Sequence, residues 1–156
     1  MRRITAVATA LMCVVILASG AVTHADGLEI GIGPAVAAVG EEFSITVVFS
    51  APNLFGVAAD FTYDGALMRY LGGNNTSDGK IVLFGQAGGA PSLSCTIRFL
   101  ALAEGSGSFT VNCTESYNAA LEDLGTPSAS STVTIRPAAT PSPTPSPTPD
   151  PSESWI

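Results

Sequence analysis

Histidine and basic residues are scarce in this chain. Its 156 residues contain one histidine, His24, and six lysines and arginines against 13 acidic residues, which gives a formal net charge of −7. Phosphate binding needs clustered Lys and Arg, so this composition argues against nucleic acid as a partner. An anionic membrane surface is disfavoured for the same reason.

The first 25 residues have the pattern of a secretory signal peptide. Arg2 and Arg3 precede an apolar run over 4–17, and small residues at 23–25 suit cleavage after Ala25. The run is shorter than the ~20 residues that cross a bilayer, which argues against a membrane anchor. We therefore expect a secreted protein without membrane insertion after processing, either free outside the cell or associated with its surface.

The other end of the chain, residues 137–156, reads as a linker or tail. It holds seven of the 11 prolines, interleaved with Ser and Thr. Such a composition cannot form a packed core and favours extended polyproline II, which makes a semi-rigid spacer. Between the two ends lies one segment, residues 26–136, with a suitable length for a single domain.

Hydrophobic residues in this domain alternate with polar ones in four segments. A period of two with one apolar face is the pattern of strands that pack on one side. The alternating segments are 43–49, 57–63, 93–99 and 109–113, and shorter candidate strands are 28–32, 67–71, 80–84 and 132–135. Turn residues separate them, and only 118–124 suits a helical turn. The pattern predicts an all-β domain, an antiparallel β-sandwich.

Only two cysteines remain once the signal peptide, with Cys13, is removed. Cys95 and Cys113 both fall on the apolar register of their strands. In an oxidising compartment we expect them to form a disulfide, across a hairpin or between facing sheets. The alternative is two buried free thiols that fill the core.

Several segments in chain order resemble the strands of cohesin domains. The most informative is 53–71 (NLFGVAADFTYDGALMRYL), where a loop Asn and a Gly lead into an alternating strand that ends in Tyr-Asp. It is preceded by the Val-Gly-acidic sequence at 39–43. The segments 78–84, 93–102, 107–113 and 131–136 resemble the sixth to ninth strands, so the resemblance covers roughly 28–135.

This resemblance implies a nine-stranded jelly-roll sandwich that docks a dockerin-bearing protein. In the family such pairs assemble polysaccharide-degrading enzymes, and the dockerin carries the calcium, so this chain itself needs no cofactor. The partner surface is a flat sheet that contains strands eight, three and six. Carried onto this sequence, its outward positions are Ala58, Asp60, Thr62, Lys80, Val82, Phe84, Thr110, Asn112 and Thr114. The segment 72–79 is too short for the usual fifth strand, which predicts a reduced binding face.

The residues do not predict an enzyme or a metal site. No histidine remains after processing, and no nucleophile has an identifiable base. Asp60 and Asp64 share a strand face and form a candidate carboxylate pair, but exposed acids on a strand are usually solubility residues. The segment 74–78 (NNTSD) lacks the spaced acidic ligands of a calcium loop.

Two other functions remain open. A carbohydrate-binding module shares this kind of sandwich, but it usually needs exposed aromatics that stack on sugar rings. Here most aromatics fall on core registers, and the single tryptophan, Trp155, lies in the tail. A structural or adhesive surface domain is the third possibility, and it predicts binding to neither dockerin nor glycan.

Overall fold

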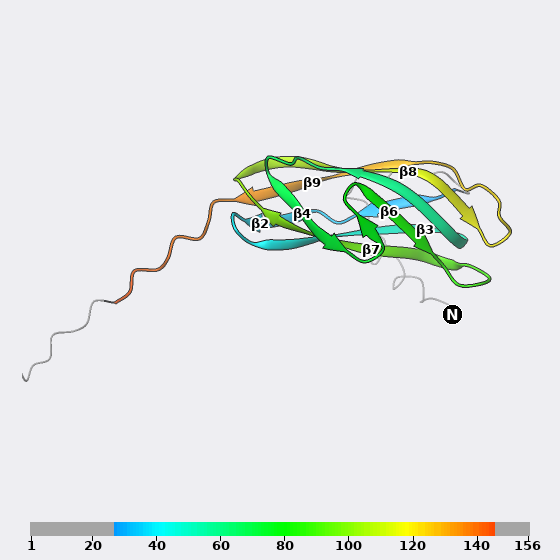
Figure 1. Ribbon diagram of the computed structural model, residues 1–156, viewed down its shortest axis with the longest axis horizontal. Helices are drawn as coiled ribbons and strands as arrows, with labels where there is room; N and C mark the ends of the chain where they lie inside the picture. Colours follow the sequence, from blue (N-terminus) through cyan, green and yellow to red (C-terminus); the bar gives the residue numbers. More distant parts are fainter. Residues whose placement is uncertain (1–26, 146–156) are drawn as a thin grey trace, which may run out of the picture.

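The computed structural model describes residues 27–145. Residues 29–136 form an elongated body of strands, and 137–145 extend away from it (Figure 1). The proposed signal peptide and residues 146–156, with Trp155, lie outside the described residues. The strands are β1 (Glu29–Ile32), β2 (Ala35–Ala38), β3 (Glu42–Thr62), β4 (Met68–Gly73), β5 (Thr76–Ser77), β6 (Lys80–Phe84), β7 (Ala90–Ala101), β8 (Gly105–Asn118) and β9 (Ser128–Arg136). No helix in this part of the chain is long and apolar enough to cross a membrane.

The long strand β3 builds both layers of the sandwich. Its first half pairs with β1 and β7, and β4 continues that sheet beyond β7. Its second half pairs with β6 and β8, and β5 and β9 continue the second sheet on either side. The strand bends between Ser50 and Leu54, where Asn53 has a positive φ of 54°. The sequence predicts two strands with a turn at this place, whereas the structure has one strand that changes sheets.

Alternation explains which face of each strand is buried. In β3 and β7 the inward residues Ile45, Val47, Ile97 and Phe99 are at most 1% exposed. Polar residues between them, such as Thr46, point to solvent. A period-two pattern of this kind stabilises a two-layer sandwich because each sheet hides only one face.

Aromatic rings fill the centre between the two sheets. Phe99 packs edge-on against Phe109 at 5.9 Å between ring centroids and against Tyr63 at 5.0 Å. Phe61, from the second half of β3, lies 5.6 Å from Phe109. Because these rings come from β3, from the residue that follows it (Tyr63), from β7 and from β8, the cluster joins the two sheets at one point of the core.

The expected short strands are present, and two local expectations change. The segment 72–79 does form a fifth strand, β5, but only two residues long, which agrees with its shortness in the sequence. The segment 118–124 is not a helical turn: it forms a loop in which Asn118 accepts hydrogen bonds from the backbone NH groups of Ala120 and Glu122. An Asn side chain competes in this way with helical hydrogen bonds.

Candidate docking face

The outward face of β6, the second half of β3, and β8 carries cross-strand rows of side chains. Strand pairing sets each row: Asp60 lies between Lys80 and Asn112, and Ala58 lies between Val82 and Glu115. Gly56 lies between Phe84 and Tyr117. We call this surface, together with Thr62 and Thr110 at its far end, the docking face.

All nine residues predicted for partner binding come together around this face. Eight occupy its outward rows, half-buried or exposed, while Ile81 and Leu83 of β6 turn into the core. The outward register of β6 is therefore the one expected. The eight residues in the rows are Ala58, Asp60, Thr62, Lys80, Val82, Phe84, Thr110 and Asn112.

Thr114 differs because β8 contains a bulge there. The pairing passes from Cys113 opposite Ala59 to Glu115 opposite Ala58, which leaves Thr114 as the extra residue. Its hydroxyl donates to the carbonyl of Ala58 at 3.1 Å. The bulge resets the alternation, so Glu115 and Tyr117 face outward where the sequence pattern ends at Thr114. No local signal in the sequence predicts this bulge.

The polar end of the docking face is held by side-chain contacts. Lys80 Nζ lies 2.6 Å from Asp60 Oδ1, with both side chains largely exposed. Ser128 on β9 donates to Asn112 at 2.8 Å, and the hydroxyls of Thr110 and Ser130 are also 2.8 Å apart. Asp60 is thus paired with a cation, so it does not form a free carboxylate pair with Asp64, whose side chain accepts the NH of Ala66.

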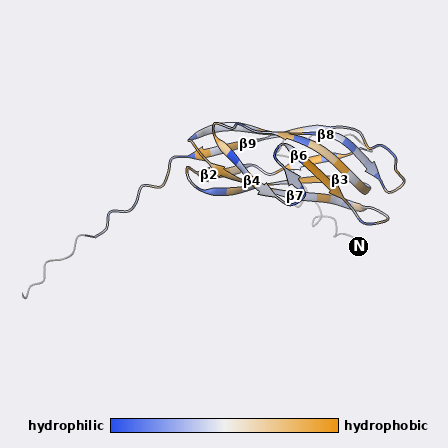
Figure 2. Ribbon diagram, viewed as in Figure 1, coloured by the Kyte–Doolittle hydropathy of each residue, from blue (hydrophilic) through white to orange (hydrophobic). Residues whose placement is uncertain are grey.

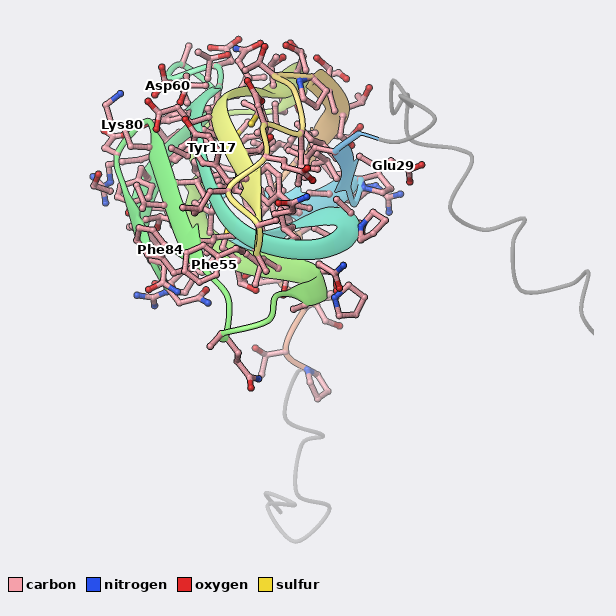
Figure 3. The ribbon with its side chains drawn as sticks, turned by 90° about the vertical axis from the view of Figure 1, so that its right-hand side faces the viewer. Glu29, Phe55, Asp60, Lys80, Phe84 and Tyr117 are labelled. Atoms are coloured by element: carbon pink, nitrogen blue, oxygen red, sulfur yellow. The ribbon has the colours of Figure 1, made fainter. Side chains whose placement is uncertain are left out.

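The opposite end of the docking face is apolar. Phe84 is 75% exposed, Val82 46% and Tyr117 38%. A Cβ on Gly56 would lie 3.6 Å from the Phe84 ring, so this ring packs across the glycine and keeps its outer side open. Strand β6 appears hydrophobic over most of its length in Figure 2, and Figure 3 shows Phe84 beside Phe55, whose carbonyl accepts the NH of Gly85.

The disulfide prediction is wrong, because Cys95 and Cys113 are both buried free thiols. Cys95 pairs with Val47 in one half of β3 and Cys113 with Ala59 in the other. The Cys113 thiol is directed at backbone carbonyls, including that of Glu115 at 3.3 Å. Burial raises the pKa of each thiol to about 11, so both stay protonated and unreactive at neutral pH.

The segment 74–78, which contains β5, uses its polar groups within the protein. Asn74 accepts the backbone NH of Thr96 at 2.8 Å, and Asp78 accepts the Tyr63 hydroxyl at 3.0 Å. Burial, followed by this hydrogen bond, raises the pKa of Tyr63. Within residues 27–145, no three His, Cys, Asp or Glu side chains gather closely enough to hold a metal ion.

Comparison with known proteins gives structural matches alone. No family model and no curated protein sequence matches the chain. A non-cellulosomal cohesin from the hyperthermophilic archaeon Archaeoglobus fulgidus superposes with a TM-score of 0.58 at 16% identity, over 70% of this chain and 91% of that one.

A second match is a type I cohesin from Clostridium thermocellum that was crystallised with a dockerin. Its TM-score is also 0.58, at 13% identity, over 70% of this chain and 99% of that one. Identities this low carry information on the fold. The strands of residues 27–145 therefore form a cohesin-like β-sandwich.

Proposed function

We propose that this chain is a secreted docking module that binds a dockerin-bearing protein through the docking face. The observation that carries the proposal is the layout of that face. An exposed apolar end (Val82 and Phe84) adjoins the small residues Ala58 and Gly56, and a polar row follows at Asp60. Protein interfaces combine an apolar centre with hydrogen-bonding groups around it in this manner.

A helix laid on the sheet is the partner that this layout suits. Small side chains along β3 let a helix approach the backbone, while Phe84 and Tyr117 offer apolar contact on either side. The polar row then supplies an acceptor at Asp60 and an amide at Asn112. The solved C. thermocellum complex of the same fold supports a dockerin as the source of that helix.

The role in the cell follows as part of the same proposal. A signal peptide over 1–25 would bring the domain outside the cell, and the 137–156 segment would act as a spacer. There the module would hold a dockerin-bearing, polysaccharide-degrading enzyme, with the calcium carried by the dockerin. The chain itself would do no chemistry.

A pulldown with matched variants tests the proposal. Residues 26–156 are immobilised and exposed to proteins secreted by the source organism in the presence of calcium, and bound proteins are eluted with a chelator. We expect proteins with paired calcium-loop repeats in the eluate. Ala58→Arg should abolish their retention, because it places a charged, bulky side chain in the middle of the docking face.

Thr46→Arg is the control for this pulldown. Thr46 is exposed on the first half of β3, opposite Thr96, and so lies on the outer face of the other sheet. It should leave retention unchanged. An empty eluate from the folded wild-type domain, or equal losses in the two variants, would contradict the docking function.

Carbohydrate binding is the second candidate, because the structure exposes two aromatic rings in one row. Phe84 and Tyr117 flank Gly56, and the open side of the Phe84 ring is a surface on which a sugar ring could stack. Co-sedimentation with insoluble polysaccharide tests it. Retention that disappears in Phe84→Ala, together with an empty pulldown, would favour this function. Failure of both assays would favour the structural or adhesive domain.

A further inference from the structure

Three connections meet at the apolar end of the docking face. The β6–β7 loop, the bend of β3 and the β8–β9 loop lie together there, at the right of Figure 1. Leu54 pairs with Asn118, and the Asn53 carbonyl accepts the NH of Ala119 at 2.8 Å. The β8–β9 loop therefore continues the docking face beyond the edge of the sheet, and Figure 3 views this end directly.

The β8–β9 loop holds a leucine outward in an unfavourable conformation. Leu121 is 72% exposed and has a φ of 62°. A leucine in the left-handed region costs about 1–2 kcal/mol, and Asn or Gly would suit the position better. Asn118 fixes the loop, because it also donates from Nδ2 to Glu122 at 2.7 Å. Strain of this kind points to a functional contact.

Acidic side chains surround the apolar residues at this end. Glu115 lies in the row next to Tyr117, and Asp123 forms a bridge with Tyr117. Within residues 27–145 the basic residues lie elsewhere: Lys80 is paired with Asp60, and Arg69, Arg98 and Arg136 are on β4, β7 and the last position of β9. We call the following six residues the end patch: Phe84, Tyr117, Leu121, Glu115, Glu122 and Asp123.

We infer that the end patch selects a partner helix whose apolar side chains are flanked by lysine or arginine. The inference rests on the proposed docking function and defines the chemistry of the partner. The three apolar members of the patch cover the helix stripe, and the carboxylates lie at its basic flanks. Glu115 accepts no hydrogen bond with its side chain among those the structure shows, whereas one oxygen of Glu122 accepts from Asn118 and one oxygen of Asp123 accepts the NH of Gly125 at 2.8 Å, which leaves the second oxygen of each for the partner. Opposite charges around an apolar centre raise the association rate and set the orientation of the partner.

Two designed helical peptides probe this preference. They share one stripe of leucines at helical spacing and differ only in flanking residues, which are lysine in one and glutamate in the other. Residues 26–156 are titrated with each peptide at low salt, and binding is followed by fluorescence anisotropy. We expect the lysine peptide to bind at least about tenfold more tightly, with a difference that shrinks as salt screens the charges.

Charge reversals locate the effect. Glu115→Lys should lower the affinity for the lysine peptide about tenfold. Glu104→Lys makes the same charge change in the β7–β8 turn, at the other end of the sandwich, and should change binding little. Equal effects of the two reversals would mean general attraction to an acidic protein and would overturn the inference, as would equal affinity for the two peptides.

Leu121→Asn provides a readout of opposite sign. It should raise the unfolding temperature, because Asn adopts positive φ more readily, yet weaken the lysine peptide because the apolar anchor is lost. Unchanged binding of the lysine peptide would show that Leu121 does not contact the partner, and it would contradict the role given to this residue in the end patch. The pulldown separates the two proposals. If a dockerin is retained by wild type and by Glu115→Lys but lost in Ala58→Arg, this inference is overturned while the docking function stands. If the preference for the lysine peptide depends on Glu115 but the pulldown is empty, the end patch would select basic helices and the dockerin-binding function would be wrong.

Discussion

Cys95 and Cys113 are both buried, but their sulfur atoms have different surroundings. The Cys113 thiol lies within reach of the carbonyls of Ala58 at 3.5 Å and Glu115 at 3.3 Å. Cys95 is 1% exposed, and its neighbours across the strands are apolar, such as Val47. A polar atom at the two positions should therefore have different consequences.

Serine substitutions measure this difference. Cys95→Ser should lower the free energy of unfolding by about 1–3 kcal/mol, because it buries a hydroxyl among apolar groups. Cys113→Ser should cost clearly less, since its hydroxyl can donate to the same carbonyls. Urea denaturation of the two variants checks this. Neither thiol should react with a thiol reagent before the protein unfolds. If unfolded wild-type protein contains no thiol that reacts, Cys95 and Cys113 form a disulfide after all.

Gly88 and Gly89 both have positive φ, at 94° and 81°, but only Gly89 touches the β3 bend. Gly88→Ala should cost about 1–2 kcal/mol from the backbone conformation, because a Cβ there meets open space. Gly89→Ala should cost more, because its Cβ would collide with the backbone of Asn53. The denaturant concentrations at which the two variants are half unfolded give the comparison. Equal losses of stability would show that the backbone at the β3 bend moves away from the added Cβ at little cost.

At the scale of the element, the bulge in β8 is the feature that shapes the docking face. Without the extra residue Thr114, the residues that follow would continue the alternation of 109–113 without interruption. The bulge keeps Ser116 inward, where it donates to the carbonyl of Gly125 at 2.6 Å, and keeps Tyr117 outward. Strand β8 thus contains one extra residue, and the residues after it still point to the same faces of the sheet as they would without it.

Single-residue deletions test this description. Deleting Thr114 should preserve the fold, because it converts the bulge into a regular ladder and leaves the neighbouring pairs in place; the loss is about 1 kcal/mol for its hydrogen bond. Deleting Thr110 should unfold the domain, because either Phe109 or Val111 must leave the core. Circular dichroism and thermal unfolding distinguish the two. A folded Thr110 deletion would show that β8 tolerates a register shift.

Periodicity in the sequence predicts most strands, because each sheet buries one face and solvates the other. It fails where the chain changes direction without a change of pattern. At the β3 bend, Pro52 and Asn53 look like a turn between strands, but hydrogen bonding continues on both sides. At Thr114 the alternation breaks because of tertiary pairing with Ala58, which no local preference encodes.

At the scale of the whole molecule, β9 closes the sandwich. It pairs antiparallel with β8 and parallel with β2, and its residues Val133 and Ile135 are 1% and 2% exposed. The last strand of the described residues therefore pairs with the second, β2, and the fold depends on contacts distant in sequence. Such contacts make folding slow and complete only when the final strand is present.

Truncation tests where the domain ends. Residues 26–136 should unfold cooperatively at the same temperature as 26–156, because residues 137–145 add no strand to the sandwich. Residues 26–127, which lack β9, should show no cooperative transition, because Val133 and Ile135 would leave the core open. Differential scanning calorimetry makes the comparison. A lower unfolding temperature for 26–136 would place part of the tail within the cooperative unit.

The described chain enters and leaves the sandwich at opposite ends. Residue 28 enters beside Leu124, whereas Arg136 leaves beside Ala38 and Val39 at the opposite end (Figure 1). Tension between these points runs along the strands, so the hydrogen bonds of β2 with β9 and of β1 with β3 are loaded together in shear rather than opened one after another. A pull applied between residue 28 and Arg136 would therefore pass along the length of the strands, parallel to the docking face.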